Sequence, residues 1–367
     1  MKPRVLFISR RMTTPLPEGD RRRWDAVRKV LDFRVIASGT GGDDEFRLAR
    51  EPPLIAGLGY YVALPARIAA ELRRFRPHAV VSQGLHETAA ALAARTIARS
   101  DTAVIADVHG DWRAPTRLYG SRLRSALNPA ADRIAEVALQ RADGVRTVTA
   151  YTTALVRERG VEPTDEFPAY MDFALFLARP PVPLPERPQA LFVGVLERYK
   201  NVDGLATAWR RVAPSVEGAR LHLVGDGALA PTVRRLLDEL PEQTRWSPSL
   251  TQAQVADALD ESTCLVLPSR SEGMGRVVIE AFCRGRGVIG TRVGGIPDLV
   301  EDGANGLLVE PGDVEALARA IERLLGDRDL AGRLGRAAYA SADLWTISAE
   351  EFAQRLRALV DRVARLE

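Results

Sequence analysis

Both halves of the chain alternate short apolar segments with amphipathic stretches, and this alternation constrains the fold more than any other feature. The apolar segments are rich in Val, Leu and Ile and do not alternate with polar residues, which is typical of strands buried on both faces of a parallel sheet. Helical patterns lie between them, and such repeated strand–helix units predict two doubly wound, Rossmann-like α/β domains. The apolar segments are residues 5–8, 33–37, 79–82, 104–108 and 145–148 in the first half, and 191–193, 221–224, 265–267 and 288–289 in the second.

A proline-rich segment separates the two halves. It has five prolines within residues 179–188, and because proline fixes φ and lacks a backbone N–H, the segment is neither a helix nor a central strand. The sequence therefore predicts a first domain over residues 1–180, a linker over 181–189 and a second domain over 190–345. An amphipathic helix is expected in the remaining part, residues 346–367.

Composition and charge exclude several classes of protein. The 367 residues suffice for two domains, and a net charge of +3 with 27% charged residues excludes a disordered polyelectrolyte and a basic nucleic-acid-binding arm. Two cysteines, Cys264 and Cys283, cannot form a disulfide framework or a structural zinc site. The apolar run near the N-terminus is too short for a signal peptide, and no segment approaches the roughly 18 apolar residues of a membrane span. We therefore expect a cytoplasmic protein without a nucleic-acid partner.

Glycines mark three strand ends in the second half, where open α/β sheets bind their ligands. At the third of these a helix begins near Gly275, and its N-terminal N–H groups suit a phosphate. Glu272 precedes this helix and Glu280 lies inside it, about 10 Å away by the rise per residue. A carboxylate accepts two hydrogen bonds from a vicinal diol, so this pair fits the sugar and the ribose of a nucleotide-sugar. Alone, Glu280 would be interpreted as a surface carboxylate.

The stretch from Glu272 to Glu280, followed by residues 294–300 and 305–309, resembles the retaining family 4 glycosyltransferases of the GT-B fold. The Glu-x7-Glu spacing matches the family signature, and the resemblance is specific over residues 190–312 and weaker over the first half. It implies two Rossmann-like domains facing a cleft, with the final helix crossing back onto the N-terminal domain. It also implies that the second domain binds the donor through Gly194, Gly225, Gly227, Gly273, Met274, Gly275, Arg276, Val277 and Glu280.

Lys200 is one of only three lysines among 51 basic residues, and it lies in the loop after the first strand of the second half. By the resemblance, this lysine and an arginine five residues earlier hold the leaving diphosphate. Val195 occupies the position of that arginine, and Arg198 in the same loop is a candidate for the second charge. The resemblance therefore implies catalytic roles for Lys200, Glu272 and His109, and Arg198 joins them as the candidate for the missing charge.

The first half contributes two further candidates. His109 follows the apolar segment 104–108, and the resemblance implies that it faces the donor sugar; the alternative is a structural histidine bonded to a backbone carbonyl. The loop and helix start over residues 10–23 contain five arginines, which suit an anionic acceptor or lipid headgroups. Gly19 and Arg21 are the candidate acceptor-side residues there, and a solvated basic loop is the alternative.

Together these features predict a retaining enzyme that moves a hexosyl group from a UDP- or GDP-sugar to a hydroxyl acceptor in glycan, glycolipid or natural-product biosynthesis. The resemblance implies that the departing phosphate takes the acceptor proton, so neither a cofactor nor a metal is expected. An anionic or lipid-linked acceptor, and peripheral contact with the inner membrane face, remain open.

Rival functions compete with this one. Because Val195 replaces the arginine, the chain could be a catalytically weakened GT-B nucleotide-binding or scaffold protein. Sugar phosphorylases and epimerases share the fold and also stay open. An NAD-dependent oxidoreductase is disfavoured, since the chain has no Gly-x-Gly-x-x-Gly at a strand end.

Overall fold

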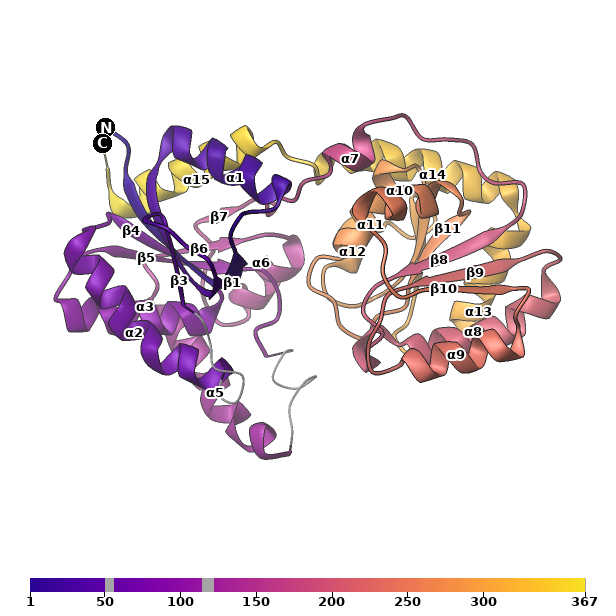
Figure 1. Ribbon diagram of the computed structural model, residues 1–367, viewed down its shortest axis with the longest axis horizontal. Coiled ribbons are helices and arrows are strands. Elements are labelled where there is room, and N and C mark those ends of the chain that lie inside the picture. The colour runs from indigo at the N-terminus through magenta and orange to yellow at the C-terminus, as the bar shows by residue number, and fades with distance from the viewer. Residues whose placement is uncertain (50–55, 114–121, 367) are drawn as a thin grey trace. The chain divides into compact units, whose positions relative to one another are not determined.

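The computed structural model describes residues 1–49, 56–113 and 122–366. The chain divides into two compact units, coloured along the chain in Figure 1. The first unit contains Met1–Tyr170 and Ile347–Glu367, and the second contains Met171–Thr346. Both are α/β units with parallel sheets, so the predicted fold class is confirmed.

The sheet of the first unit has the strand order β3-β2-β1-β4-β5-β6-β7 among the described residues. All these pairings are parallel, and helices return the chain between most of the strands, whereas β2 and β3 are joined by a short loop. The strands are β1 (Arg4–Thr13), β2 (Asp32–Thr40), β3 (Phe46–Ala49), β4 (Ala79–Gln83), β5 (Ala103–Val108), β6 (Gly144–Thr147) and β7 (Asp165–Glu166); the helices are α1 (Glu18–Val30), α2 (Ala56–Arg74), α3 (Leu85–Ala98), α5 (Arg122–Arg141), α6 (Ala150–Arg157) and α15 (Ala349–Ala364).

The sheet of the second unit has the order β10-β9-β8-β11-β12-β13. The order reverses beside β8, which pairs with β9 on one side and β11 on the other, and such reversals place a ligand at the strand ends. The elements are α7 (Ala174–Leu177), β8 (Gln189–Val193), η1 (Arg198–Lys200), α8 (Val202–Ser215), β9 (Arg220–Val224), α9 (Ala230–Glu239), β10 (Thr244–Ser247), α10 (Gln252–Asp260), β11 (Cys264–Leu267), α11 (Arg276–Cys283), β12 (Gly287–Thr291), α12 (Ile296–Leu299), β13 (Gly306–Val309), α13 (Val314–Gly326), α14 (Arg328–Ser341) and η2 (Ala342–Leu344).

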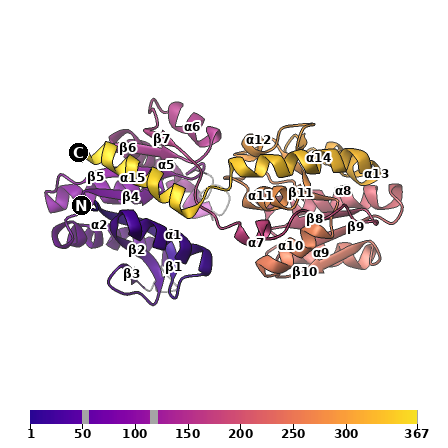
Figure 2. The ribbon, with the colours of Figure 1, turned by 90° about the horizontal axis from the view of Figure 1, so that it is seen from above.

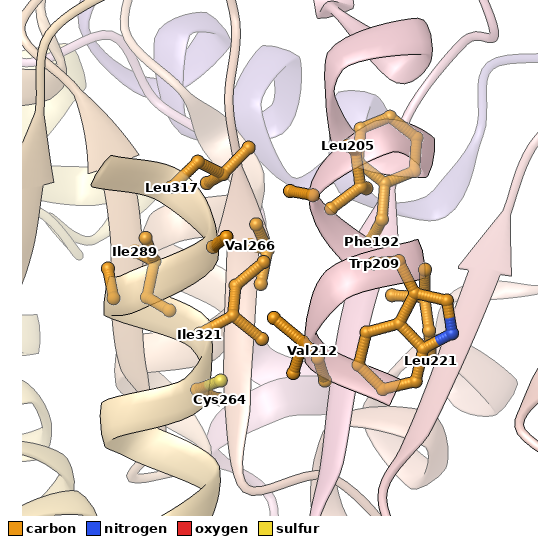
Figure 3. Packing of buried hydrophobic residues seen from close by; sticks show 14 of the residues in the cluster. Phe192, Leu205, Trp209, Val212, Leu221, Cys264, Val266, Ile289, Leu317 and Ile321 are labelled. Carbon is orange, nitrogen blue, oxygen red and sulfur yellow. The ribbon is translucent and has the colours of Figure 1, made fainter. Parts of the chain in front are cut away.

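Apolar side chains from the sheet and from helices on both its faces form the core of the second unit. On one face, Trp209 of α8 and Ile321 of α13 pack over Val266 of β11, and all three are fully buried (Figure 3). On the other face, helices α10 and α11 pack against the same strands. Burial on both faces explains why the strands appear in the sequence as continuous apolar runs.

The last helix, α15, belongs to the first unit and lies beside α1 (Figures 1 and 2). Its apolar face, which includes Phe352, Leu356 and Leu359, is buried against the first sheet. The chain thus leaves the first unit after Tyr170 and returns to it at Ile347. This is the predicted crossing of the final helix.

The proline-rich segment differs from the predicted linker, because it lies inside the second unit. Arg284 is fully buried and donates hydrogen bonds to the carbonyls of Phe176, Arg179 and Pro180. Further along, buried Arg286 donates to the carbonyls of Val182 and Pro183. A proline lacks the backbone N–H but still presents a carbonyl oxygen, and these arginines bind carbonyls along the segment.

Candidate functional site

The three glycine-marked strand ends of the second unit meet through their backbones. Gly225, which follows β9, has φ +135° and lies so close to the loop after β8 that a Cβ there would be 1.9 Å from the Gly194 carbonyl oxygen. The N–H of Gly194 in turn donates to the Val224 carbonyl at 2.9 Å. Gly227 approaches the Leu196 carbonyl in the same way. Only glycine fits such approaches, and they bring the first two loops together.

Lys200 and Glu272 form an ion pair across the loops after β8 and β11. Lys200 Nζ lies 2.5 Å from Glu272 Oε2, and the two side chains are 12% and 15% exposed. The hydroxyl of Ser269 donates to the same carboxylate oxygen at 3.3 Å. The ammonium is therefore held at the carboxyl ends of the strands by a partner 72 positions away in the sequence.

A second link between these loops was missed by the sequence reasoning. The guanidinium of Arg270 donates two hydrogen bonds to Asn201 Oδ1, at 2.9 and 3.1 Å. The Arg270 N–H also donates to the Tyr199 carbonyl. Asn201 is buried and has φ +55°, a left-handed conformation that asparagine tolerates better than most residues. The sequence feature that could have indicated this link is the asparagine directly after Lys200.

Helix α11 begins at Arg276, and Gly275 precedes it with φ +76°. Met274 and Val277 pack against the core below, so they fix the position of the helix start. In this structure Arg276 Nε lies 2.8 Å from Glu280 Oε1, and the carboxylate side chain is 10% exposed. Burial raises the pKa of Glu280, and Arg276 offsets only part of this effect.

Two further glycines position the loop that contains Glu272 and Gly273. Gly294 has φ +56°, and a Cβ there would lie 1.8 Å from the Glu272 carbonyl oxygen. The N–H of Gly295 donates to the Gly273 carbonyl at 2.9 Å. The Gly-Gly pair after β12 therefore shapes the loop before α11.

Val195 and Arg198 lie on the surface of the loop after β8. Val195 is 47% exposed, and its side chain supplies no charge where the resemblance implies an arginine. Arg198 begins the short helix η1 and is exposed, and its guanidinium makes no hydrogen bond or ion pair with any residue in the described ranges. The guanidinium of Arg198 is therefore free to bind an anion.

The first unit brings His109 together with two charged residues that were not singled out in the sequence. His109 follows β5, and its Nε2 lies 2.9 Å from Asp107 Oδ2. The other Asp107 oxygen accepts a hydrogen bond from Arg146 Nη1 at 2.7 Å. Burial alone would raise the pKa of Asp107, but Arg146 and His109 outweigh it and hold the pKa at about 2. A charged residue inside the four-residue buried strand β6 was the signal for Arg146.

A depression of about 640 Å³ opens at the carboxyl ends of β1, β2 and β4. Gly19 lies in the first turn of α1, and Arg21 is exposed and does not line the depression. Arg23, two residues further along α1, lines it instead, and its Nε is buried without a hydrogen-bond partner in the described part of the chain. The basic side chains that line this depression are therefore Arg11 and Arg23, and the candidate Arg21 is not among them.

The described residues contain neither a metal-binding cluster nor a membrane span. No three His, Cys, Asp or Glu side chains within the described ranges are grouped so that they could hold a metal ion. None of the helices in those ranges is long and apolar enough to cross a membrane.

Comparison with known proteins adds two family models and many relatives. The model of the glycosyl transferase 4-like domain matches residues 4–167, and that of glycosyl transferases group 1 matches residues 187–327. Sulfoquinovosyl transferase SQD2 of Arabidopsis thaliana is 32% identical over 157 residues, which are 42% of this chain and 30% of the relative. The chain spans less than half the length of the curated relatives it matches.

Solved structures resemble the whole chain. Sucrose-phosphate synthase from Thermosynechococcus elongatus has a TM-score of 0.79 at 20% identity, with all of both chains covered. Anabaena HepE in complex with UDP has a TM-score of 0.72 at 16% identity, covering 99% of this chain and 100% of HepE. At these identities the likeness concerns the fold.

Two parallel α/β units, with loops meeting at the strand ends of the second, define the GT-B fold. The two matching models together cover most of the chain, one for each unit. The chain belongs to the family 4 glycosyltransferases.

Proposed function

We propose that the protein is a retaining hexosyltransferase that uses a nucleotide diphosphate sugar as donor and a hydroxyl compound as acceptor. The observation that carries the proposal is the buried Lys200–Glu272 pair beside the N-terminus of α11. A compact ammonium and free helix N–H groups are the partners that a diphosphate requires. The structurally similar HepE was solved in complex with UDP, which supports a UDP-sugar as the first donor to test.

In the proposed reaction the bond between the sugar C1 and the diphosphate oxygen breaks, and C1 forms a bond with the acceptor oxygen on the same face. The acceptor proton goes to the departing phosphate. Lys200 stabilises the charge that grows on this leaving group, with Arg198 as second cation. Glu272 and Glu280 accept hydrogen bonds from the sugar and ribose hydroxyls, respectively. No residue or metal acts as a separate base, so EDTA is expected to leave turnover unchanged.

We place the acceptor in the 640 Å³ depression of the first unit, where Arg11 and Arg23 supply positive charge. Asp20 offsets part of this charge, because it lies 3.2 Å from Arg23 Nη2. The surplus favours an acceptor with an anionic group, free or lipid-linked. A lipid-linked acceptor would bring this cytoplasmic enzyme into peripheral contact with the inner membrane face.

A thermal-shift screen of UDP-, GDP-, ADP- and TDP-glucose tests the donor site. Binding to the folded state alone adds about 2.7 kcal/mol of stability at a ligand concentration 100 times the Kd. The proposal predicts that one of these donors raises the Tm and that Glu280→Ala removes the shift. If no nucleotide sugar shifts the Tm of the wild type, the donor site is wrong.

The exposed Val195 favours a second candidate, a nucleotide-binding protein without transfer activity. Such a protein would bind a nucleotide sugar in calorimetry and release neither sugar nor nucleoside diphosphate with any acceptor. Turnover of the bound donor would exclude it.

A further inference from the structure

Three side chains of the first unit form a chain of hydrogen bonds that runs from the interior to a cavity. Arg146 on β6 is 1% exposed, Asp107 on β5 is 12% exposed and His109 is 33% exposed. The distances along the chain are 2.7 Å from Arg146 to Asp107 and 2.9 Å from Asp107 to His109. His109 is thus the most exposed of the three.

Arg146 is held rigidly from several sides. Its Nη2 donates to the carbonyls of Phe167 and Pro168, and its guanidinium lies 4.0 Å from the ring centre of Phe167. The ring of Phe352 on α15 lies 5.4 Å away. These contacts leave Arg146 one orientation, and so the carboxylate of Asp107 is fixed as well.

The carboxylate of Asp107 determines which nitrogen of His109 carries the proton. An ionised carboxylate only accepts hydrogen bonds, and the low pKa of Asp107 keeps it ionised at neutral pH. The nitrogen that faces it, Nε2, must therefore be the N–H. In neutral His109 this leaves Nδ1 as an acceptor, and Nδ1 makes no hydrogen bond with any described residue.

His109 lines a cavity of about 60 Å³ at the carboxyl ends of the strands. Ser9, Gln83 and Arg23 line both this cavity and the larger depression next to it. The charged and titratable groups around the imidazole are Asp107, Arg146, Arg23 and Tyr170. The cavity that His109 lines therefore borders the proposed acceptor depression.

We propose that Arg146 and Asp107 are positioning residues that hold neutral His109 with its proton on Nε2, so that Nδ1 accepts a hydrogen bond from a substrate hydroxyl. The identity of that hydroxyl rests on the proposed function, but the tautomer does not. A purely structural role of the Arg146–Asp107 pair would not explain why His109 is bonded to it, because a buried Arg–Asp pair needs no partly exposed histidine as a further partner. Apolar residues also often replace such pairs without loss of stability.

The tautomer can be measured directly, because the chain has only four histidines. Two-bond ¹H–¹⁵N NMR of the ¹⁵N-histidine-labelled full chain, at a pH where His109 is neutral, distinguishes the protonated ring nitrogen from the unprotonated one. His109→Gln identifies the signals by their loss. We expect the proton of wild-type His109 on Nε2, and a proton on Nδ1 would overturn the proposal without any further variant.

Asp107→Asn gives the second test. Arg146 can donate only to the amide oxygen, so the amide NH₂ must face His109 Nε2, and the histidine proton is expected to move to Nδ1. Asp107→Asn/Arg146→Met frees the amide to turn, so the proton is expected to return to Nε2. If the tautomer of the single variant equals that of the wild type, Asp107 does not control it.

Turnover of the donor selected by the thermal-shift screen gives the functional readout. Loss of an orienting partner typically costs 10–100-fold in activity, so we expect about this loss in Asp107→Asn and partial recovery in the double variant. A double variant no more active than the single one would mean that the pair is only structural. If the wild type binds no donor while its tautomer is as expected, the proposed function fails and the positioning by Asp107 stands.

Discussion

Replacing Lys200 by methionine removes the ammonium from the donor loops and keeps an unbranched side chain. In the native protein Nζ lies 2.5 Å from Glu272 Oε2, and both side chains are largely buried. The substitution leaves this carboxylate with the Ser269 hydroxyl at 3.3 Å. A hydrogen bond to a charged group contributes about 1.5–3 kcal/mol. Because water still reaches the 15% of Glu272 that is exposed, we expect a loss of about 2 kcal/mol in the free energy of unfolding.

The same substitution also lowers turnover, because it removes a charge that stabilises the transition state. A preorganised charge that stabilises a leaving group contributes roughly 3 kcal/mol to the transition state. Its loss corresponds to a fall in turnover of at least about 100-fold. For a domain of this size, the stability loss corresponds to a Tm lower by about 4–8 °C. The variant is therefore folded at 25 °C and nearly inactive.

Two control variants separate the effects. Lys200→Met/Glu272→Gln removes both charges, so the Tm is expected to recover while turnover does not. Lys29→Met removes an exposed lysine that pairs with Glu350 at 3.0 Å, and it is expected to change neither quantity. Thermal unfolding and release of nucleoside diphosphate are measured on the four proteins. Wild-type turnover in Lys200→Met would refute the assignment of the ammonium to the leaving group.

Three further predictions concern buried charges. Burial raises the pKa of Glu280, so its carboxylate destabilises the folded state once the pH exceeds the pKa that Glu280 has in the unfolded chain. Glu280→Gln should therefore raise the Tm at pH 7 and weaken UDP binding about 10–100-fold in calorimetry. A lower Tm would contradict this. The pKa of Asp107 is held at about 2, so ionised Asp107 contributes about 2 kcal/mol to the free energy of unfolding above pH 4, and this contribution is lost as the pH falls toward 2. In urea unfolding, Asp107→Asn should lose this part of the acid dependence of stability. An unchanged pH profile would refute the pairing. Arg284→Met removes the donor of three carbonyls and leaves Asp260 with Arg179 as its remaining partner. It should lower the urea-derived stability of the second unit by about 3–5 kcal/mol, and a loss below 1 kcal/mol would show that the segment is held in another way.

The sequence predicted the elements well and the ion pairs less well, for a physical reason. Strands such as β11 are buried on both faces, so their apolar runs are visible without any tertiary information. The glycines at the strand ends were also visible in the sequence, and in the structure Gly225 permits a close backbone approach that only glycine fits. By contrast, the partner of Lys200 is 72 positions away, and nothing local in the sequence specifies it. Arg23 was missed because the direction in which a helix presents its side chains follows from packing, not from charge density.

The buried arginines also locate the point at which the chain passes from one unit to the other. Arg146 binds the carbonyls of Phe167 and Pro168 in the first unit, and Arg284 binds that of Phe176 in the second. Proline content suggested that flexibility would reside in residues 181–189, but the carbonyls of Val182 and Pro183 are bound by Arg286. Proline restricts φ and so stiffens a segment that is anchored in this way. Substitutions in the proline-rich segment should therefore affect the stability of the second unit, to which the segment belongs.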